Sequence, residues 1–284
     1  MALTKTIRRA LRPAVKTAQS VWRWKRLSFR DAPPMFGNSK PKSGSHLLLQ
    51  VLAGICQVVP YKYAAAEPVR TITKEGRRRT KEEILDELKR IPRGVIGWGY
   101  VEASPENVEF LCRPGRVNYF VYRDPRDLLV SQVFFATDMY EDHGMHAYYK
   151  SLPDFDERLK VAIRGIDRDA LHMVNVRQRY EGVFQWLEQK NVLCIRFEDL
   201  MNSRDATLNA MLNEVEKAGY KIPAPRDEAL SILVQSIRPK KSHTFRSGKT
   251  GAWKEYYKEE HKELFKDVAG DLLVRLGYEE GNDW

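Results

Sequence analysis

The sequence predicts an α/β fold, a single domain with a central parallel sheet flanked by helices. Short runs of buried-type residues alternate with helix-like segments along the 284 residues, which is the order that places parallel strands between covering helices. With 43% hydrophobic and 30% charged residues, the chain can bury a full core. No run reaches the roughly 18–20 apolar residues needed to cross a bilayer. Three scattered cysteines, Cys56, Cys112 and Cys194, exclude a disulfide framework and indicate a reducing compartment.

The positive charge is concentrated in an N-terminal arm, residues 1–34, which precedes the predicted domain, residues 35–284. The net charge is +10, yet residues 1–30 hold nine of the 48 Lys and Arg residues and no acidic residue. The remainder, with 39 basic and 38 acidic residues, is nearly neutral, which argues against a nucleic-acid partner. Three interpretations of this partly amphipathic arm are open: docking on an anionic membrane, an organellar transit peptide, or a helix packed on its own domain. We expect a cytoplasmic protein. If the first interpretation holds, we expect it also to be peripheral to a membrane.

Five segments have the length and apolar character of strands: residues 35–38, 61–66, 95–100, 117–122 and 192–197. The segment 117–122 is the clearest. It runs into Asp-Pro, and proline suits an early position of a helix.

Helices are expected between these strands. Thr80 and Glu83 form a capping box, and Gly219 and Gly277 follow helical patterns as stop signals. The expected helices are residues 47–58, 80–90, a helix from 125, 167–189, 204–218, 226–237 and 258–276. Residues 69–79, 138–156 and 238–252 are expected to be polar or basic loops.

The first strand and the first helix are joined by a loop typical of anion sites. Its sequence is Pro41-Lys42-Ser43-Gly44-Ser45-His46. Small residues let backbone N–H groups turn toward a phosphate, the helix N-terminus adds positive potential, and Lys42 adds a full charge. The loop is not a Walker A motif, because the lysine precedes Gly44 instead of following it.

Two later segments fit the same kind of ligand. Arg123 follows the clearest strand and Ser131 lies eight residues on; ligands of open α/β sheets bind at the carboxyl ends of strands, and arginine contacts phosphate bidentately. The third segment is Phe245-Arg246-Ser247-Gly248-Lys249-Thr250-Gly251-Ala252-Trp253-Lys254. It combines two glycines with a guanidinium and an apolar anchor, as a flap over a phosphate would.

Together these segments resemble the sulfotransferase family that uses 3′-phosphoadenosine 5′-phosphosulfate (PAPS). Residues 41–48 are similar to the family's P-K-S-G-T-T-W-L, and residues 123–131 are similar to its Arg followed by D/N-P-R/K-D, with a Ser eight residues after the Arg. Residues 246–254 are similar to its R-K-G-x-x-G-D-W-K, and residues 197–200 are similar to its (Y/F)-E-D-L. The matches follow the family's order over residues 35 to about 278.

The resemblance implies a P-loop-like parallel sheet and transfer of a sulfuryl group from PAPS to an alcohol or amine. The residues implied to hold the 5′-phosphosulfate are Lys42, Ser43, Gly44, Ser45 and His46, and those implied to hold the 3′-phosphate are Arg123, Ser131, Arg246, Ser247 and Gly248. Lys42 would stabilise charge on the leaving oxygen, so no metal is expected. Three positions depart from the family pattern: His46 replaces a Thr, Ser247 a Lys and Ala252 an Asp.

The general base and the acceptor stay open. Glu67 is the first choice for the base, followed by His143 and His146, with Glu102 weaker. Tyr100 lies where many relatives have a His, and its ordinary pKa of about 10 makes it a poor base. Aromatic residues in the segment 134–156 suit a carbohydrate, a lipid or a small alcohol. Two other functions compete: an ATP-using kinase-like P-loop protein, and a non-catalytic module that binds the desulfonated product, PAP.

Overall fold

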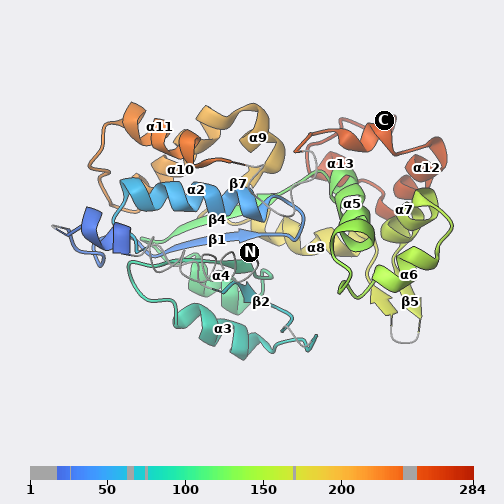
Figure 1. Cartoon of the computed structure of the whole chain (residues 1–284), viewed down its shortest axis with the longest axis horizontal. Helices are drawn as coiled ribbons and strands as arrows, with labels where there is room; N and C mark the ends of the chain where they lie inside the picture. The colour runs from blue at the N-terminus through green and yellow to red at the C-terminus, as the bar shows by residue number, and fades with distance from the viewer. Residues whose placement is uncertain (1–17, 26, 63–66, 74–75, 169–170, 239–247) are drawn as a thin grey trace, which may run out of the picture.

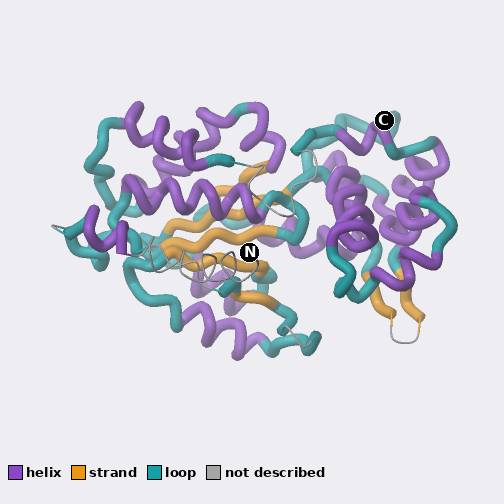
Figure 2. The backbone as a smooth tube through the Cα atoms, viewed as in Figure 1, coloured by secondary structure: helices purple, strands orange, loops and turns teal. Residues whose placement is uncertain are grey.

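The predicted parallel sheet is confirmed. The computed structural model describes residues 18–25, 27–62, 67–73, 76–168, 171–238 and 248–284. Within this part of the chain, five parallel strands form one sheet in the order β2-β3-β1-β4-β7, drawn in orange in Figure 2. The strands are β1 (Met35–Ser39), β2 (Val69–Arg70), β3 (Ile96–Tyr100), β4 (Val117–Tyr122) and β7 (Leu193–Arg196). Asn38 of β1 is in register with Gly99 and Phe120, so the three central strands end together.

Helices cover both faces of the sheet (Figure 1). One face carries α2 (Ser45–Val58), α9 (Phe197–Asn202), α10 (Arg204–Lys217) and α11 (Arg226–Ser236), and the other carries α3 (Lys81–Lys89), α4 (Pro105–Leu111) and α8 (Val176–Leu187). Each side has its own buried cluster, because every strand of a doubly covered sheet presents apolar side chains to two layers. Asn38 is buried in the sheet, where its side chain accepts from the backbone N–H of Val101 and donates to the Val101 carbonyl oxygen, both at 2.9 Å.

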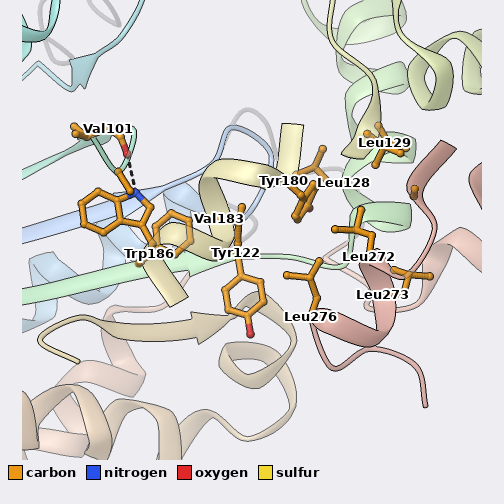
Figure 3. Packing of buried hydrophobic residues seen from close by; sticks show 14 of the residues in the cluster. Val101, Tyr122, Leu128, Leu129, Tyr180, Val183, Trp186, Leu272, Leu273 and Leu276 are labelled. Atoms are coloured by element: carbon orange, nitrogen blue, oxygen red, sulfur yellow. Dashed lines mark hydrogen bonds between the residues drawn. The ribbon is translucent and has the colours of Figure 1, made fainter. Parts of the chain in front are cut away.

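A helical group lies beyond the carboxyl ends of the strands, on the right of Figure 1. It contains α5 (Pro125–Phe134), α6 (His146–Ser151), α7 (Phe155–Arg164), α12 (Glu259–Ala269), α13 (Leu272–Arg275) and the hairpin β5 (Ile166–Arg168) with β6 (Leu171–Met173). Figure 3 shows how the group joins the sheet: Leu272, Leu273 and Leu276 lie near Leu128 and Tyr180 in a continuous apolar cluster. In the same view the Trp186 indole N–H donates to the Val101 carbonyl oxygen at 3.0 Å.

Several predicted boundaries are wrong. The helix predicted for 167–189 begins only at Val176, because residues 166–173 form the β5–β6 hairpin, and residues 138–156 contain α6 where a loop was expected. The predicted 258–276 helix is interrupted at Gly270. Helices α4 and α7 were not predicted, although Ser104 before Pro105 is a helix-start signal. Of the strand predicted for 61–66, Lys62 forms an isolated bridge with Val95, and residues 63–66 lie outside the described residues.

Candidate functional site

A cavity of about 540 Å³ lies at the carboxyl edge of the sheet. The first loop, the ends of β3 and β4, helix α5 and Gly248 of the third segment all line it. The predicted residues that line it are Lys42, Gly44, Ser45, His46, Tyr100, Arg123, Ser131 and Gly248. Lys42, Arg70 and Arg123 supply positive charge, and no Asp or Glu occurs among the residues described as lining it. The cavity is therefore suited to an anionic ligand.

The first loop turns sharply before α2. Lys42 has a φ of 67° and Gly44, the N-cap of α2, has a φ of 93°. A Cβ on Gly44 would lie 2.5 Å from Cδ2 of Phe197, so this position requires glycine both for its conformation and for space. The turn points the first N–H groups of α2 at the cavity, as helix N-termini do in phosphate sites.

Two side chains of the loop are held at the cavity wall. The Lys42 ammonium lies 4.0 Å from the centroid of the Phe135 ring, a cation–π distance. The Tyr100 hydroxyl donates to Ser45 Oγ at 3.1 Å. Ser43 is fully buried, and its Oγ has no hydrogen-bond partner among the described residues. Such an unsatisfied buried hydroxyl is costly, and an anion bound in the loop would accept a hydrogen bond from it.

Arg123 is presented at the end of β4 by contacts on several sides. Its carbonyl accepts from the buried Tyr180 hydroxyl at 2.7 Å, and its guanidinium carbon lies 4.5 Å from the Phe197 ring centroid. One terminal nitrogen donates to the Lys249 carbonyl at 3.2 Å. The buried Nε has no partner within the described ranges. The guanidinium therefore retains unused donor capacity, and Arg123 lines the cavity.

Asp127 fixes the third segment against α5. Its carboxylate, only 1% exposed, accepts from the backbone N–H groups of Gly251 at 2.9 Å and Trp253 at 2.8 Å. It also pairs with Arg123 at 3.4 Å. The second motif thus positions the third, a connection that the sequence did not reveal.

A second, half-buried carboxylate connects the ends of β4 and β7. Glu198 accepts from the Asp124 backbone N–H at 3.2 Å and from the Tyr278 hydroxyl at 2.8 Å. Burial raises the pKa values of both Glu198 and Tyr278. Phe197, which precedes Glu198, contacts both Gly44 and Arg123. The F-E-D-L segment therefore supports the site without placing a charged side chain in the wall of the cavity.

The other predicted residues that the structure describes, Ser43 included, do not line the cavity. Arg246 and Ser247 lie outside the described residues. Glu67 is exposed and is not among the lining residues. Glu102 forms an exposed ion pair with Arg78 at 2.9 Å.

His143 and His146 contact residues of the segment that follows α5, Phe135 and Ala136. The His143 ring lies edge-on to Phe135, with centroids 5.9 Å apart, and its Nδ1 accepts from the Met145 backbone N–H at 3.1 Å. Burial lowers its pKa, with smaller contributions from Lys42 and other nearby cations. The Nδ1 of His146 lies 2.8 Å from the Ala136 carbonyl oxygen, so this nitrogen carries a proton and Nε2 of the neutral ring keeps its lone pair.

Lys40 is a cation that the sequence analysis did not single out. It lies between β1 and Lys42 and is partly buried. Burial, followed by the charge of Arg179, lowers its pKa to about 8. Its ammonium therefore loses its proton closer to neutral pH than an ordinary lysine does.

The basic run at residues 77–79 is neutralised. Arg77 pairs with Glu83 at 2.8 Å and Arg79 with Glu87 at 2.5 Å, in addition to the Arg78 pair. Within the described ranges, no group of three or more His, Cys, Asp or Glu side chains is placed to hold a metal ion. Nor does any helix in this part of the chain have the length and apolar character to span a bilayer.

Comparison with solved structures shows the fold. Mouse sulfotransferase SULT7A1 complexed with PAP is 20% identical, with a TM-score of 0.58 over 87% of this chain and 88% of that chain. Retinol dehydratase with androsterone and PAP is 14% identical, with a TM-score of 0.57 over 84% and 80%. Its complex with retinol and PAP gives a TM-score of 0.56 at 14% identity, over 84% and 81%. No family model matches the sequence, and neither does any curated protein. The chain therefore has the sulfotransferase fold expected from its motifs.

Proposed function

We propose that this protein is a PAPS-dependent sulfotransferase. The observation that carries the proposal is a cavity in which the residues of three separate motifs meet: Lys42 of the first, Arg123 of the second and Gly248 of the third, with no Asp or Glu among its described lining residues. The donor carries phosphate at both ends of its ribose, so it needs separated cationic contacts in one cavity. The shared fold with proteins solved with PAP supports the same assignment.

In the proposed reaction, the acceptor oxygen bonds to the donor's sulfur as the bond from sulfur to the bridging oxygen of the 5′-phosphate breaks. PAP leaves, and the acceptor proton passes to a base. Lys42 would stabilise the charge that builds on the leaving oxygen, as preorganised cations do in group transfer. Ser43, Ser45, His46 and the N–H groups around Gly44 would bind the 5′ end.

The 3′-phosphate would be bound at the end of β4. Arg123 and Ser131 line the cavity, and the donor capacity of the Arg123 guanidinium suits a phosphate oxygen. Gly248 would add a backbone contact, together with Arg246 and Ser247 of the same segment. The Asp127 tether would hold the third segment near Arg123 before the donor binds.

For the base we propose His146. Its Nδ1 is positioned to donate to the Ala136 carbonyl, which leaves Nε2 able to accept a proton. In His143 the nitrogen that accepts from Met145 is Nδ1, so a neutral ring carries its proton on Nε2 and is placed to donate. Of the four candidates, Tyr100 lines the cavity but its hydroxyl donates to Ser45, while Glu67, His143 and His146 are not among the lining residues.

The acceptor is proposed to be a small molecule with a hydroxyl or amine group and an apolar body. Ile72, Phe135 and Tyr140 line the cavity beside Lys42, and the Phe135 and Tyr140 rings stack with centroids 5.5 Å apart. Aromatic walls of this kind pack on sugars, lipids and apolar alcohols alike. The androsterone and retinol named for the retinol dehydratase structures make apolar alcohols the first to test.

A binding and turnover experiment tests the proposal. We expect PAP, but not ATP with magnesium, to raise the melting temperature, and labelled PAPS to transfer sulfate to members of an alcohol panel. Lys42→Ala should lower kcat by about 10²–10³, while the exposed Lys190→Ala should leave kcat unchanged. Stabilisation by ATP with magnesium alone would favour a kinase-like protein. Binding of PAP without turnover across the panel would favour a non-catalytic module.

The base is tested separately. We expect His146→Gln to lower kcat by at least 10² without weakening PAP binding, and His143→Gln and Glu67→Gln to lower it much less. If Glu67→Gln produces the large loss, the tautomer argument is wrong.

A further inference from the structure

A second cavity, of about 490 Å³, lies at the amino edge of the sheet, the opposite edge from the first. The start of β1 and the connections that lead from α3 to β3 and from α4 to β4 line it. Its floor is apolar and includes Met35, Phe36 and Phe110. Its charged lining residues are Lys89, Arg93, Arg113 and Arg116, and none of the described lining residues is Asp or Glu.

Three of these cations, Arg93, Arg113 and Arg116, lie close enough to repel one another. The guanidinium carbon of Arg116 lies 4.3 Å, and that of Arg113 5.4 Å, from the Phe110 ring centroid. The pKa of Arg116 is lowered by its burial and then by the charges of Arg113 and Arg93. Arg113 has one ion pair, with Glu109 at 3.3 Å, and both side chains are exposed. Within the described ranges Arg93 and Arg116 form no ion pair, so an anion in this groove would relieve like-charge repulsion.

Exposed apolar residues lie at the same edge. Trp22 is 74% exposed and Leu27 is 44% exposed, and the exposed cations Arg23 and Lys25 are their neighbours. Residues 18–23 are helical and form the blue turn at the left end of Figure 1, away from α5. This turn is fixed to the domain, because the Trp24 indole N–H donates to the Cys56 carbonyl at 3.0 Å.

The segment that follows connects this turn to the groove. A Cβ built on Gly94, the residue after Arg93, would lie 2.6 Å from the Cβ of Phe29. The Lys62 ammonium lies 5.3 Å from the Phe29 ring centroid. Phe29 therefore packs beside the residue that follows Arg93, which brings the chain leading from the Trp22 turn next to the cationic groove.

We propose that the amino edge of the sheet docks on a membrane surface that contains anionic lipid. The groove of four cations binds a phosphate-bearing headgroup, and Trp22 and Leu27 enter the interface between headgroups and acyl chains. Trp favours this interface, and each basic residue near an anionic surface adds to binding. This docking does not depend on the proposed reaction, and it uses only residues from Trp22 onward, so it stands apart from residues 1–17 of the arm.

Vesicle co-sedimentation of the full chain tests the proposal. We expect strong binding to vesicles of 70% phosphatidylcholine and 30% phosphatidylserine, weak binding to phosphatidylcholine alone, and a loss of binding as salt is raised. The variant Arg93→Gln/Arg113→Gln/Arg116→Gln should bind roughly a hundredfold more weakly. A control with the same charge change, at the exposed residues Arg164, Arg168 and Arg275, should bind as the unmodified protein does.

Two further variants keep the test decisive. Arg93→Gln alone replaces an exposed side chain and should weaken binding about fivefold even if the triple variant does not fold. Trp22→Ala should weaken binding to both kinds of vesicle. Equal binding to neutral and anionic vesicles, or full binding by Arg93→Gln and the triple variant, would overturn the proposal. PAP affinity is measured on the same samples, so a failure here is distinct from a failure of the proposed reaction.

Discussion

Replacing Lys40 with methionine should stabilise the protein near neutral pH. The folded chain lowers the pKa of Lys40 from 10.5 to about 8, which means that the fold disfavours the charged ammonium. At 1.36 kcal/mol per pKa unit, the charged side chain costs ~3 kcal/mol at pH 7. Methionine keeps most of the length and removes the charge, so Lys40→Met should raise the free energy of unfolding by about that amount.

The pH dependence has a definite sign. The cost is fully present below the folded pKa of about 8 and disappears as pH rises toward the unfolded value, because the unfolded chain then also loses the proton. The advantage of Lys40→Met should therefore fall to roughly 1.4 kcal/mol at pH 9.5. Urea unfolding of both proteins at pH 7 and pH 9.5 measures it. An unchanged or lower stability of Lys40→Met at pH 7, or an advantage that grows with pH, would refute the reasoning.

Three further predictions concern the scaffold of the site. Asp127→Asn should lower the free energy of unfolding by roughly 2–3 kcal/mol in urea titrations, because one amide oxygen cannot replace a carboxylate that accepts both N–H groups of the Gly251–Trp253 turn; PAP affinity, measured by calorimetry, should fall as well. Gly44→Ala should cost about 1–3 kcal/mol and weaken PAP binding, since its Cβ would meet Phe197 at 2.5 Å; an unchanged melting temperature would show that the loop can relax. Tyr100→Phe should weaken PAP binding about fivefold through the lost hydrogen bond to the first loop and leave kcat within about twofold, so a large kcat loss in steady-state assays would identify Tyr100 as a participant in the chemistry.

The sequence predicted the sheet and its anion loop because both depend on local signals. Short apolar runs identify buried strands, and Gly44 after a strand identifies a turn into a helix. Parallel strands end at one edge, so residues that follow β1 and β4 had to converge there. Lys42 and Arg123 both line the cavity for this reason.

The sequence did not reveal contacts between distant segments. Asp127 bonds residues about 125 positions away, and Phe197 lies between the first two motifs. The lowered pKa of Lys40 depends on burial and on Arg179, neither of which has a sequence signature. The helix predicted for 167–189 was wrong in its first part because Gly165, at a φ of 77°, leads into a hairpin.

The two cavities lie at opposite ends of the strands of the sheet. Met35 borders one and the loop after Ser39 borders the other, so the length of β1, five residues or roughly 17 Å, separates them. A protein bound to lipid through the amino edge of its sheet would orient the first cavity toward the surrounding water. Any acceptor would then have to arrive dissolved or carried, since lateral diffusion within the bilayer would not lead to the opening.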